Sequence, residues 1–442
     1  MIQSFGDLFK IPELKRKIFF TMMIIAVYRV GAAIPVPDIN IVALKSFFQA
    51  QGNTLLGFLD MFSGGALGRF SIFSMGIMPY INASIIMSLL QGAHVFPYLD
   101  RLSKEGDIGR KKINQITRYL TLCLGTLQSF GLTMAMKAIT APGGAKVVNN
   151  ETWAFVFLTV LTLTTGTVFI MWLGEQITEN GIGNGISLII FAGIVDRLPS
   201  AIRNLIRLVR IEEMQFLMAV FLVIFVFVIV ALVVLVETGQ RKIPVQYAKR
   251  VVGRHMVGGS TTYLPIKVDQ SGVIAVIFAM SLLTMPMTIG QFFPNSTFAR
   301  FLENWLPYGS VQYNLLYAGL IIFFCYFYNS ISFNPTELAE NMKKWGGFIS
   351  GIRPGEATAQ YISRILERIT LWGALFVACL AVMPTYLRQL LNVPFYFGGT
   401  ALLIVVGVAL DTIGQLESHL IMRHYDGFMK SGRIKGRWFN VK

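Results

Sequence analysis

Side chains that could carry out chemistry are few and scattered in this sequence. The four histidines follow no metal-ligand spacing and no HExxH pattern; they are His94, His255, His419 and His424. The three cysteines lie inside apolar runs, where a free thiol behaves as a small hydrophobic group; they are Cys123, Cys325 and Cys379. The chain has no nucleotide-binding glycine loop, no paired intramembrane aspartates and no GxSx motif with a membrane histidine. We therefore expect no enzymatic site, no metal and no cofactor, and an intramembrane hydrolase is disfavoured.

The elements that position any functional side chain must be membrane helices. Apolar residues make up 54% of the 442 residues, charged residues only 14%, and the mean hydropathy is +0.60. A water-soluble chain of this length could not solvate so much apolar surface. The composition therefore predicts an all-α polytopic membrane protein.

Ten apolar windows are long enough to cross a bilayer, which requires roughly 20 residues for each helix. They cover residues 18–36, 70–92, 116–137, 153–173, 185–202, 214–236, 272–292, 311–333, 366–385 and 397–416. An even number of spans places both termini on one side, and the lysines and arginines outside the spans then divide 27 to 10 in favour of that side. The positive-inside rule therefore predicts that both termini lie in the cytoplasm.

One stretch, Leu55 to Leu90, is not a simple pair of spans. Its first apolar piece, Leu55 to Phe62, breaks at Gly64-Gly65 and is too short to cross hydrocarbon. Its second piece, Phe70 to Leu90, is long enough but carries a proline and several polar residues. Such a short half-helix beside a polar-faced helix is tolerated at membrane depth only where protein buries it or an aqueous cavity meets it. We interpret this stretch as the movable stopper and one wall of a pore.

Connector lengths indicate two inverted halves. Helices one to five and six to ten each have their longest connector directly after their first helix, at about 36–69 and 237–271. These connectors lie on opposite sides of the membrane, as in inverted-topology repeats. We expect an N-terminal half at 1–210 and a C-terminal half at 211–442, with a substrate passing or binding between them.

Ionisable side chains inside the spans would mark the pathway of a small solute or ion. Arg29 could reach the outer interface or pair with a carboxylate, and Asp411 lies low enough in the tenth helix to reach the cytoplasmic interface. A secondary transporter generally needs more charge at mid-depth than these two groups. It is therefore the second hypothesis, behind a conduit.

Two cytoplasmic connectors carry clustered positive charge. The first, at 237–271, combines an alternating IPVQY run with Gly-rich turns, which predicts a β-hairpin finger. The second, at 334–365, is another projecting loop, and a tail follows at about 417–442. The basic residues of the two loops are Arg241, Lys242, Lys249, Arg250, Arg254, Lys343, Lys344 and Arg353. Such charges could set topology against lipid headgroups, but long Gly-rich loops favour docking to an acidic or RNA surface.

Several long segments match one known family in order and in loop length. They read MFSGGALGRFSIFSMGIMPYI, TGTVFIMWLGEQITENGIGNGISLIIFAGIV, GQRKIPVQYAKRVVG, FNPTELAENMKKWGGFISGIRPGE and VPFYFGGTALLIVVGVALD. These segments resemble the SecY family, the large channel subunits of bacterial protein translocation. The resemblance implies ten helices in two inverted halves around an hourglass pore in the bacterial cytoplasmic membrane, opening sideways to the lipid bilayer. It also implies SecE and SecG as small subunits, signal-bearing preproteins as substrates, and SecA or a ribosome docked on the cytoplasmic loops.

The resemblance also implies roles for individual residues. The apolar pore ring falls on Ile77, Ile81, Ile186, Ile190, Ile277 and Ile404. The plug covers Leu55 to Ser71, with Leu55, Phe58, Phe62, Gly64, Gly65 and Arg69 singled out. The lateral gate between the second and seventh helices falls on Asn82, Gln128 and, with a looser match, Thr284. An apolar constriction excludes ions by dewetting yet bends around any peptide, so we predict a passive, gated conduit for unfolded polypeptide that is powered by a partner or by the membrane potential.

One position departs from the family pattern. Where the family usually has GVIPxIF at the start of the seventh helix, this chain has GVIA, with Ala275 in place of the proline. Because proline kinks a helix, we expect its loss to straighten this one.

Overall fold

The computed structural model describes most of the chain, and these residues are mainly helical. Described are residues 11–50, 60, 63–93, 96–139, 146–148, 152–212, 215–247, 250–252, 255–257, 261–292, 296–307, 309–391 and 399–431. Within these ranges six helical segments are long and apolar enough to cross a membrane. They are Trp153–Asn180, Gly185–Arg210, Phe216–Thr238, Val311–Lys344, Glu356–Leu387 and Gly399–Leu420. The predicted all-α membrane architecture is confirmed.

The helices follow the predicted windows closely, with shorter helices between them. The N-terminal ones are α2 (Pro12–Ala33), α3 (Ile41–Ala50), the 3₁₀ turn η1 (Leu67–Arg69), α5 (Met78–Gly92), α6 (Pro97–Lys104), α7 (Asp107–Ala138), α8 (Trp153–Asn180), α9 (Gly185–Val195) and α10 (Leu198–Arg210). The C-terminal ones are α11 (Phe216–Thr238), α12 (Gly272–Phe292), α13 (Thr297–Trp305), α14 (Val311–Ser332), α15 (Pro335–Lys344), α16 (Glu356–Leu391) and α17 (Gly399–Ser431).

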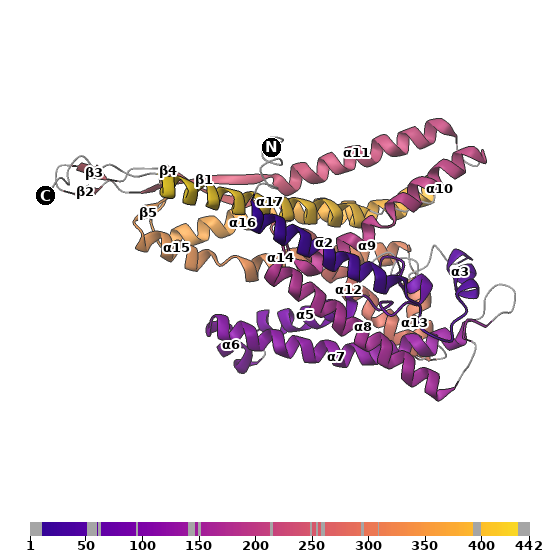
Figure 1. Ribbon diagram of the computed structural model, residues 1–442. Helices are drawn as coiled ribbons and strands as arrows, with labels where there is room; N and C mark the ends of the chain where they lie inside the picture. Colours follow the sequence, from indigo (N-terminus) through magenta and orange to yellow (C-terminus); the bar gives the residue numbers. More distant parts are fainter. Residues whose placement is uncertain are drawn as a thin grey trace.

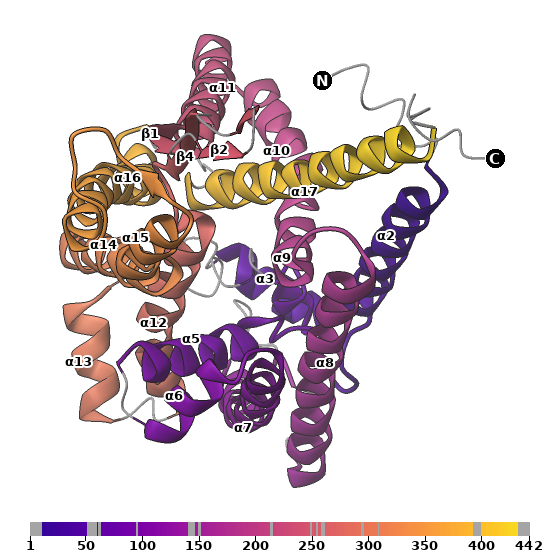
Figure 2. The same ribbon diagram turned by 90° about the vertical axis from the view of Figure 1, so that its left-hand side faces the viewer.

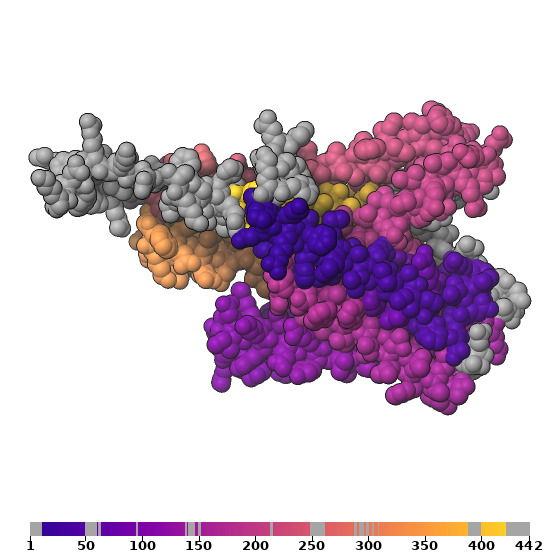
Figure 3. Space-filling model, in the orientation of Figure 1, coloured from indigo at the N-terminus to yellow at the C-terminus, as the bar shows by residue number. Residues whose placement is uncertain are grey.

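The long helices surround a common centre. Seen from one end, α12, α14 and α16 lie on one side, α2 and α8 on the other, and α5 with α7 between them (Figure 2). Helix α12 packs against α5 and α7, and α17 packs against α9, so segments from the two predicted halves meet at two places. In the space-filling view an indentation separates α6 and α7 from α15 (Figure 3). The division into inverted halves at residue 210 stays a prediction.

A small antiparallel sheet projects from one end of the molecule, which we call the finger end (Figure 1). Strands β1 (Gln240–Tyr247) and β4 (Thr261–Lys267) pair along their length, and β2 (Arg250–Val252) pairs with β3 (His255–Val257) beyond them. The predicted finger is therefore confirmed. Strand β5 (Gly347–Phe348) adds to the other edge of β1 at Gln246 and Tyr247, so the second connector is joined to the finger at the end of β1 farther from the membrane helices.

The second predicted span begins later than the apolar pattern indicated. Residues 71–77 form turns, and helix α5 starts only at Met78. Gly76 adopts a left-handed conformation with φ 55°, which a helix does not allow. Pro79 lies in the first turn of α5, where a backbone N–H has no acceptor within the helix, so the missing N–H of proline costs no hydrogen bond. The apolar run 70–92 thus contains a non-helical segment followed by a short helix.

The chain just before α5 is tied to the segment after α2. The Val36 N–H donates to the Phe70 carbonyl at 2.9 Å, and the Ile72 N–H donates to the Ile34 carbonyl at 3.0 Å. The Phe70 side chain is fully buried in a cluster with Leu44 of α3 and residues of α7 and α8. Residues 70–72 are therefore a fixed part of the fold.

Candidate channel gate

The six predicted ring isoleucines lie in one apolar cluster. Ile81 belongs to α5, Ile277 to α12 and Ile404 to α17, and Ile77 caps the N-terminus of α5. Helix α9 contributes Ile190, which is buried, and Ile186, which is half-buried and packs against the cluster. Four elements distant in sequence thus contribute these side chains to one apolar cluster, which also includes residues of other membrane helices. Their role as a pore ring stays a prediction.

Helix α9 is positioned by polar contacts at its start. The Asn184 side chain caps the helix by accepting the N–H groups of Ile186 and Ser187 at 3.1 and 3.3 Å. The preceding turn is held from both sides, because the Gly183 N–H donates to Gln415 of α17 at 2.9 Å and the Ile182 N–H donates to Thr21 of α2 at 3.2 Å. These contacts fix where Ile186 and Ile190 lie.

Part of the predicted plug packs in the same large apolar cluster as the predicted ring. Ala66 has no exposed surface and belongs to the same apolar cluster as the six isoleucines. Gly64 and Gly65 have φ 65° and 82°, a left-handed conformation that only glycine adopts readily. Arg69 is exposed in η1. The predicted plug residues Leu55, Phe58 and Phe62 lie outside the described part of the chain.

Ion pairs surround this glycine turn, and the sequence pattern did not indicate them. Arg29 of α2 pairs with Asp196 at 2.8 Å, which decides between the two alternatives left open for Arg29. Arg197, between α9 and α10, pairs with Asp60, which is only 8% exposed. The one signal in the sequence was an aspartate inside the apolar run FLDMF.

The three predicted gate residues lie on helices that pack together. Asn82 of α5 is buried, and Gln128 of α7 is half-buried. Thr284 of α12 is buried, but its hydroxyl donates to the Ser281 carbonyl of its own helix at 3.1 Å rather than across the gate. Packing of α12 against α5 and α7 is compatible with a lateral gate at this seam. The gate assignment itself stays a prediction.

Sequence and structure comparisons identify the family. The family model described as SecY matches residues 71–413. The chain is 47% identical over 427 residues to the protein translocase subunit SecY of Escherichia coli strain K12, covering 96% of each chain. The chain belongs to the SecY family.

Three solved structures share the fold, each covering 95% of both chains. One is described as a protein-conducting channel, with a TM-score of 0.68 and 18% identity. The second is a SecY structure whose plug domain is described as stabilising the closed translocation channel, with a TM-score of 0.63 and 19% identity. The third is Sec61 from a canine ribosome-channel complex of the endoplasmic reticulum, with a TM-score of 0.63 and 17% identity. As a SecY protein, the chain is a protein-translocation channel of the membrane rather than an enzyme.

The basic loops of this SecY chain are exposed where the structure describes them. Arg241 at the start of β1, Lys343 and Lys344 at the end of α15, and Arg353 before α16 all reach solvent. The Arg353 carbonyl accepts the Thr358 hydroxyl at 2.9 Å, which holds this loop onto the first turn of α16. Arg250 lies in β2, whereas Lys249 and Arg254 fall outside the described residues.

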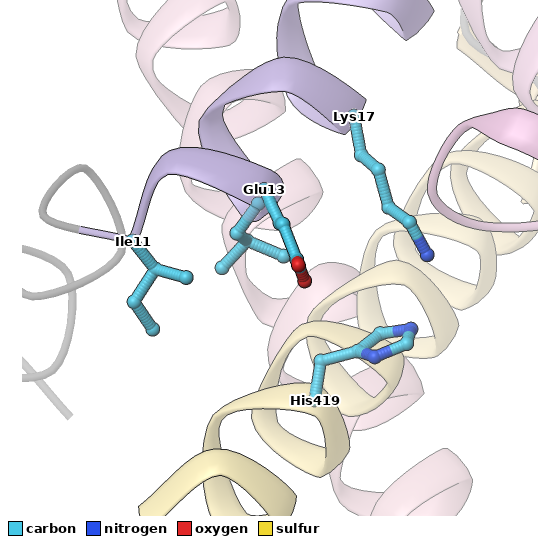
Figure 4. A pocket seen from close by; sticks show the side chains of 5 residues that line it. Ile11, Glu13, Lys17 and His419 are labelled. Carbon is cyan, nitrogen blue, oxygen red and sulfur yellow. The ribbon is translucent and has the colours of Figure 1, made fainter.

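Two cavities occur among the described residues, and the larger, of about 400 Å³, lies between α10 and α11 with a lining that is apolar except for Arg210. A polar pocket lies between α2 and α17, lined by Ile11, Glu13, Leu14, Lys17 and His419 (Figure 4). Its volume is about 40 Å³, which holds about one or two water molecules. No cluster of three or more potential metal ligands occurs among the described residues.

One buried carboxylate lies where the finger joins the membrane helices. Asp269 is 5% exposed and accepts the Gly272 N–H at 2.7 Å and the Ser271 hydroxyl at 3.1 Å. Burial raises the pKa of Asp269 above its ordinary range, although these hydrogen bonds act in the opposite direction. The two hydrogen bonds fix the loop that connects β4 to α12.

Proposed function

We propose that this SecY chain is the gated channel subunit of a bacterial cytoplasmic-membrane translocase, with both termini in the cytoplasm. Residues 55–71 act as the plug, the six isoleucines as the ring, and α5 with α12 as the lateral gate. The observation that carries this proposal is the single apolar cluster that contains all six isoleucines together with Ala66 of the plug segment. Such a cluster supports a closed, dewetted constriction.

Opening then requires α5 and α12 to separate. A signal-bearing chain that enters between them would replace the apolar contacts between the two helices with contacts to its own apolar side chains. The gate can therefore open for signal segments of many different sequences. Segments apolar enough to prefer hydrocarbon leave sideways into lipid, whereas polar segments continue through the ring. This chain supplies selectivity and closure, and the driving energy comes from its partners or from the membrane potential.

The finger and the second loop are the docking surface for those partners. Their exposed arginines and lysines fit an acidic motor such as SecA or the RNA of a ribosome, because positive loops steer and hold both kinds of surface. The joint between β1 and β5 makes the two loops one unit, so a partner bound to either loop can act on both. SecE and SecG complete the assembly as small membrane subunits.

Charge reversal at the docking surface tests this proposal. Arg353→Glu should reduce SecA-driven preprotein transport in reconstituted vesicles by at least about tenfold, since one charge becomes its opposite in a contact made of charges, while the subunits still co-purify. Arg210→Glu provides the matched control, because Arg210 is equally exposed but lies in α10 at the end opposite the finger (Figure 1). Full transport by the Arg353 variant would contradict the docking assignment.

A small-solute transporter predicts a different result. Its substrate would bind at mid-depth, so reversal of a finger-end charge would leave uptake of that solute intact, and no preprotein would be transported by either variant. ATP-dependent protection of a preprotein from external protease therefore separates the two functions.

A further inference from the structure

The plug segment is held by more than apolar contact. The Asp60 carboxylate pairs with Arg197, and the Arg197 guanidinium also donates to the Asp60 carbonyl at 3.0 Å. The same carboxylate accepts the Gly68 N–H at 2.6 Å, so it closes the plug turn on itself. Asp60 therefore connects the glycine turn to the junction between α9 and α10.

A second arginine holds the other side of the turn. Arg29 of α2 donates to the Gly64 carbonyl at 3.4 Å and to the Ala192 carbonyl of α9 at 3.1 Å, and it pairs with Asp196. The neighbouring Tyr28 hydroxyl donates to the Ser63 carbonyl at 3.4 Å. Residues of α2 and at the end of α9 thus hold the same glycine turn.

The turn also sits directly on the backbone of α9. A Cβ atom built at Gly64 would lie 2.9 Å from the Gly193 Cα atom, closer than side chains tolerate. Glycine at both positions therefore allows the plug turn to reach the carbonyl end of α9. At this short separation Arg29 contacts the Gly64 and Ala192 carbonyls together.

We propose that Arg197 and Arg29 are positioning residues that latch the plug in its closed position, with Asp60 as the plug's half of the latch. This inference rests on the proposed role of residues 55–71 as a plug. Residues 70–72 are held by the segment after α2, so the latch adds a second attachment at Asp60 and the glycine turn.

The latch couples plug release to movement of the helices. Asp196 and Arg197 are neighbours at the end of α9, and each pairs with a different element: Asp196 with α2 and Arg197 with the plug. A shift of α9 against α2 would weaken both pairs at once. Apolar contacts at the ring are non-directional, so the ion pairs supply the orientation that the ring cannot.

Neutral variants test the latch in the assembled channel with its small subunits. Asp60→Asn retains an oxygen for the Gly68 N–H but removes the charge, and Arg197→Gln removes the partner. Because the pair is partly buried, each should raise the resting open probability in planar bilayers by about tenfold, between the values for exposed and buried pairs. Arg203→Gln, at an exposed arginine of α10, should leave conductance unchanged.

A charge swap separates the pair from other effects of substitution. Asp60→Arg combined with Arg197→Asp restores opposite charges but not the Gly68 contact, so it should recover closure in part compared with Asp60→Arg alone. No difference between the swapped channel and the Asp60→Arg channel, at equal yield of assembled complex, would overturn the latch.

Plug deletion distinguishes failure of the latch from failure of the plug. Removal of residues 55–66 should raise the resting leak, and Arg197→Gln should then add nothing further. A leak on deletion without any effect of Arg197→Gln in the intact channel would remove the latch and keep the plug. If deletion causes no leak, the plug role fails and the latch fails with it.

Discussion

Replacement of ring isoleucines by asparagine should open the resting channel. We choose Ile81 and Ile404, because they come from α5 and α17 and are only 5% and 0% exposed. Burial of one isoleucine side chain contributes about 1.5–3 kcal/mol. If the open state exposes this side chain to water, each replacement costs the closed state about 2 kcal/mol, a factor of about 30 in the equilibrium between the two states.

Single-channel recording in planar bilayers measures this equilibrium directly. Ile81→Asn and Ile404→Asn should each raise the resting open probability by about 30-fold, and the double variant should exceed either. Chains with defective signal sequences should also be secreted more efficiently, because less binding energy is then needed to leave the closed state. Ile404→Val is the matched apolar control and should raise the open probability less than Ile404→Asn does, since it removes one methylene group and adds no polar atom.

A second control separates the ring from a general effect of asparagine in this membrane protein. Ile202 of α10 is 54% exposed and lies outside the apolar cluster, so Ile202→Asn should leave the resting conductance unchanged. Unchanged conductance in the Ile81/Ile404 double variant, with normal assembly, would refute the ring. A small-solute transporter with the same lesions would lose substrate binding and gain no tolerance for defective signals.

Two further predictions concern the gate and the base of the finger. One cysteine near Ser84 of α5 and one near Thr284 of α12 can be introduced in a background without native cysteines, at positions that satisfy disulfide geometry. The disulfide should block transport when it forms, and reduction should restore transport. A verified crosslink without effect on transport would exclude α12 from the gate. Burial raises the pKa of Asp269, so the carboxyl stays protonated to a higher pH in the folded state than in the unfolded state. The folded state therefore loses stability as the pH rises from the ordinary aspartate pKa to the raised pKa. Asp269→Asn removes this loss, so the melting temperature of the variant should rise relative to that of the wild type as the pH increases. A melting-temperature difference that does not depend on pH would contradict this assignment.

Sequence patterns predicted the parts of this fold that depend on local periodicity. The finger was visible because Ile243 and Val245 alternate with Lys242, Pro244 and Gln246, and the two apolar side chains are buried while the three others are exposed. The start of α5 was missed because hydropathy does not record backbone conformation. The left-handed Gly76 and the initial Pro79 decided that boundary, and both were present in an otherwise continuous apolar run.

Contacts between distant segments account for what the sequence could not provide. Asp60 and Arg197 are 137 residues apart, and nothing in the local pattern of either predicts the other. The ring isoleucines were assigned only through the family resemblance, since an isoleucine in a membrane helix faces lipid, another helix or a pore with the same local sequence. At Ala275 the helix α12 runs on without interruption, while a different proline, Pro286, lies further along it.

Closure of this channel combines two kinds of force that fail in different ways. In the proposed mechanism the ring closes by apolar contact, which is non-directional and needs no specific geometry. In the proposed mechanism the plug turn is held at Phe70 by the segment after α2 and at Asp60 by the latch, so it moves only when the contacts at Asp60 break. A shift of α9 would act on both parts of this closure, because α9 carries Ile186 and Ile190 and is followed directly by Asp196 and Arg197.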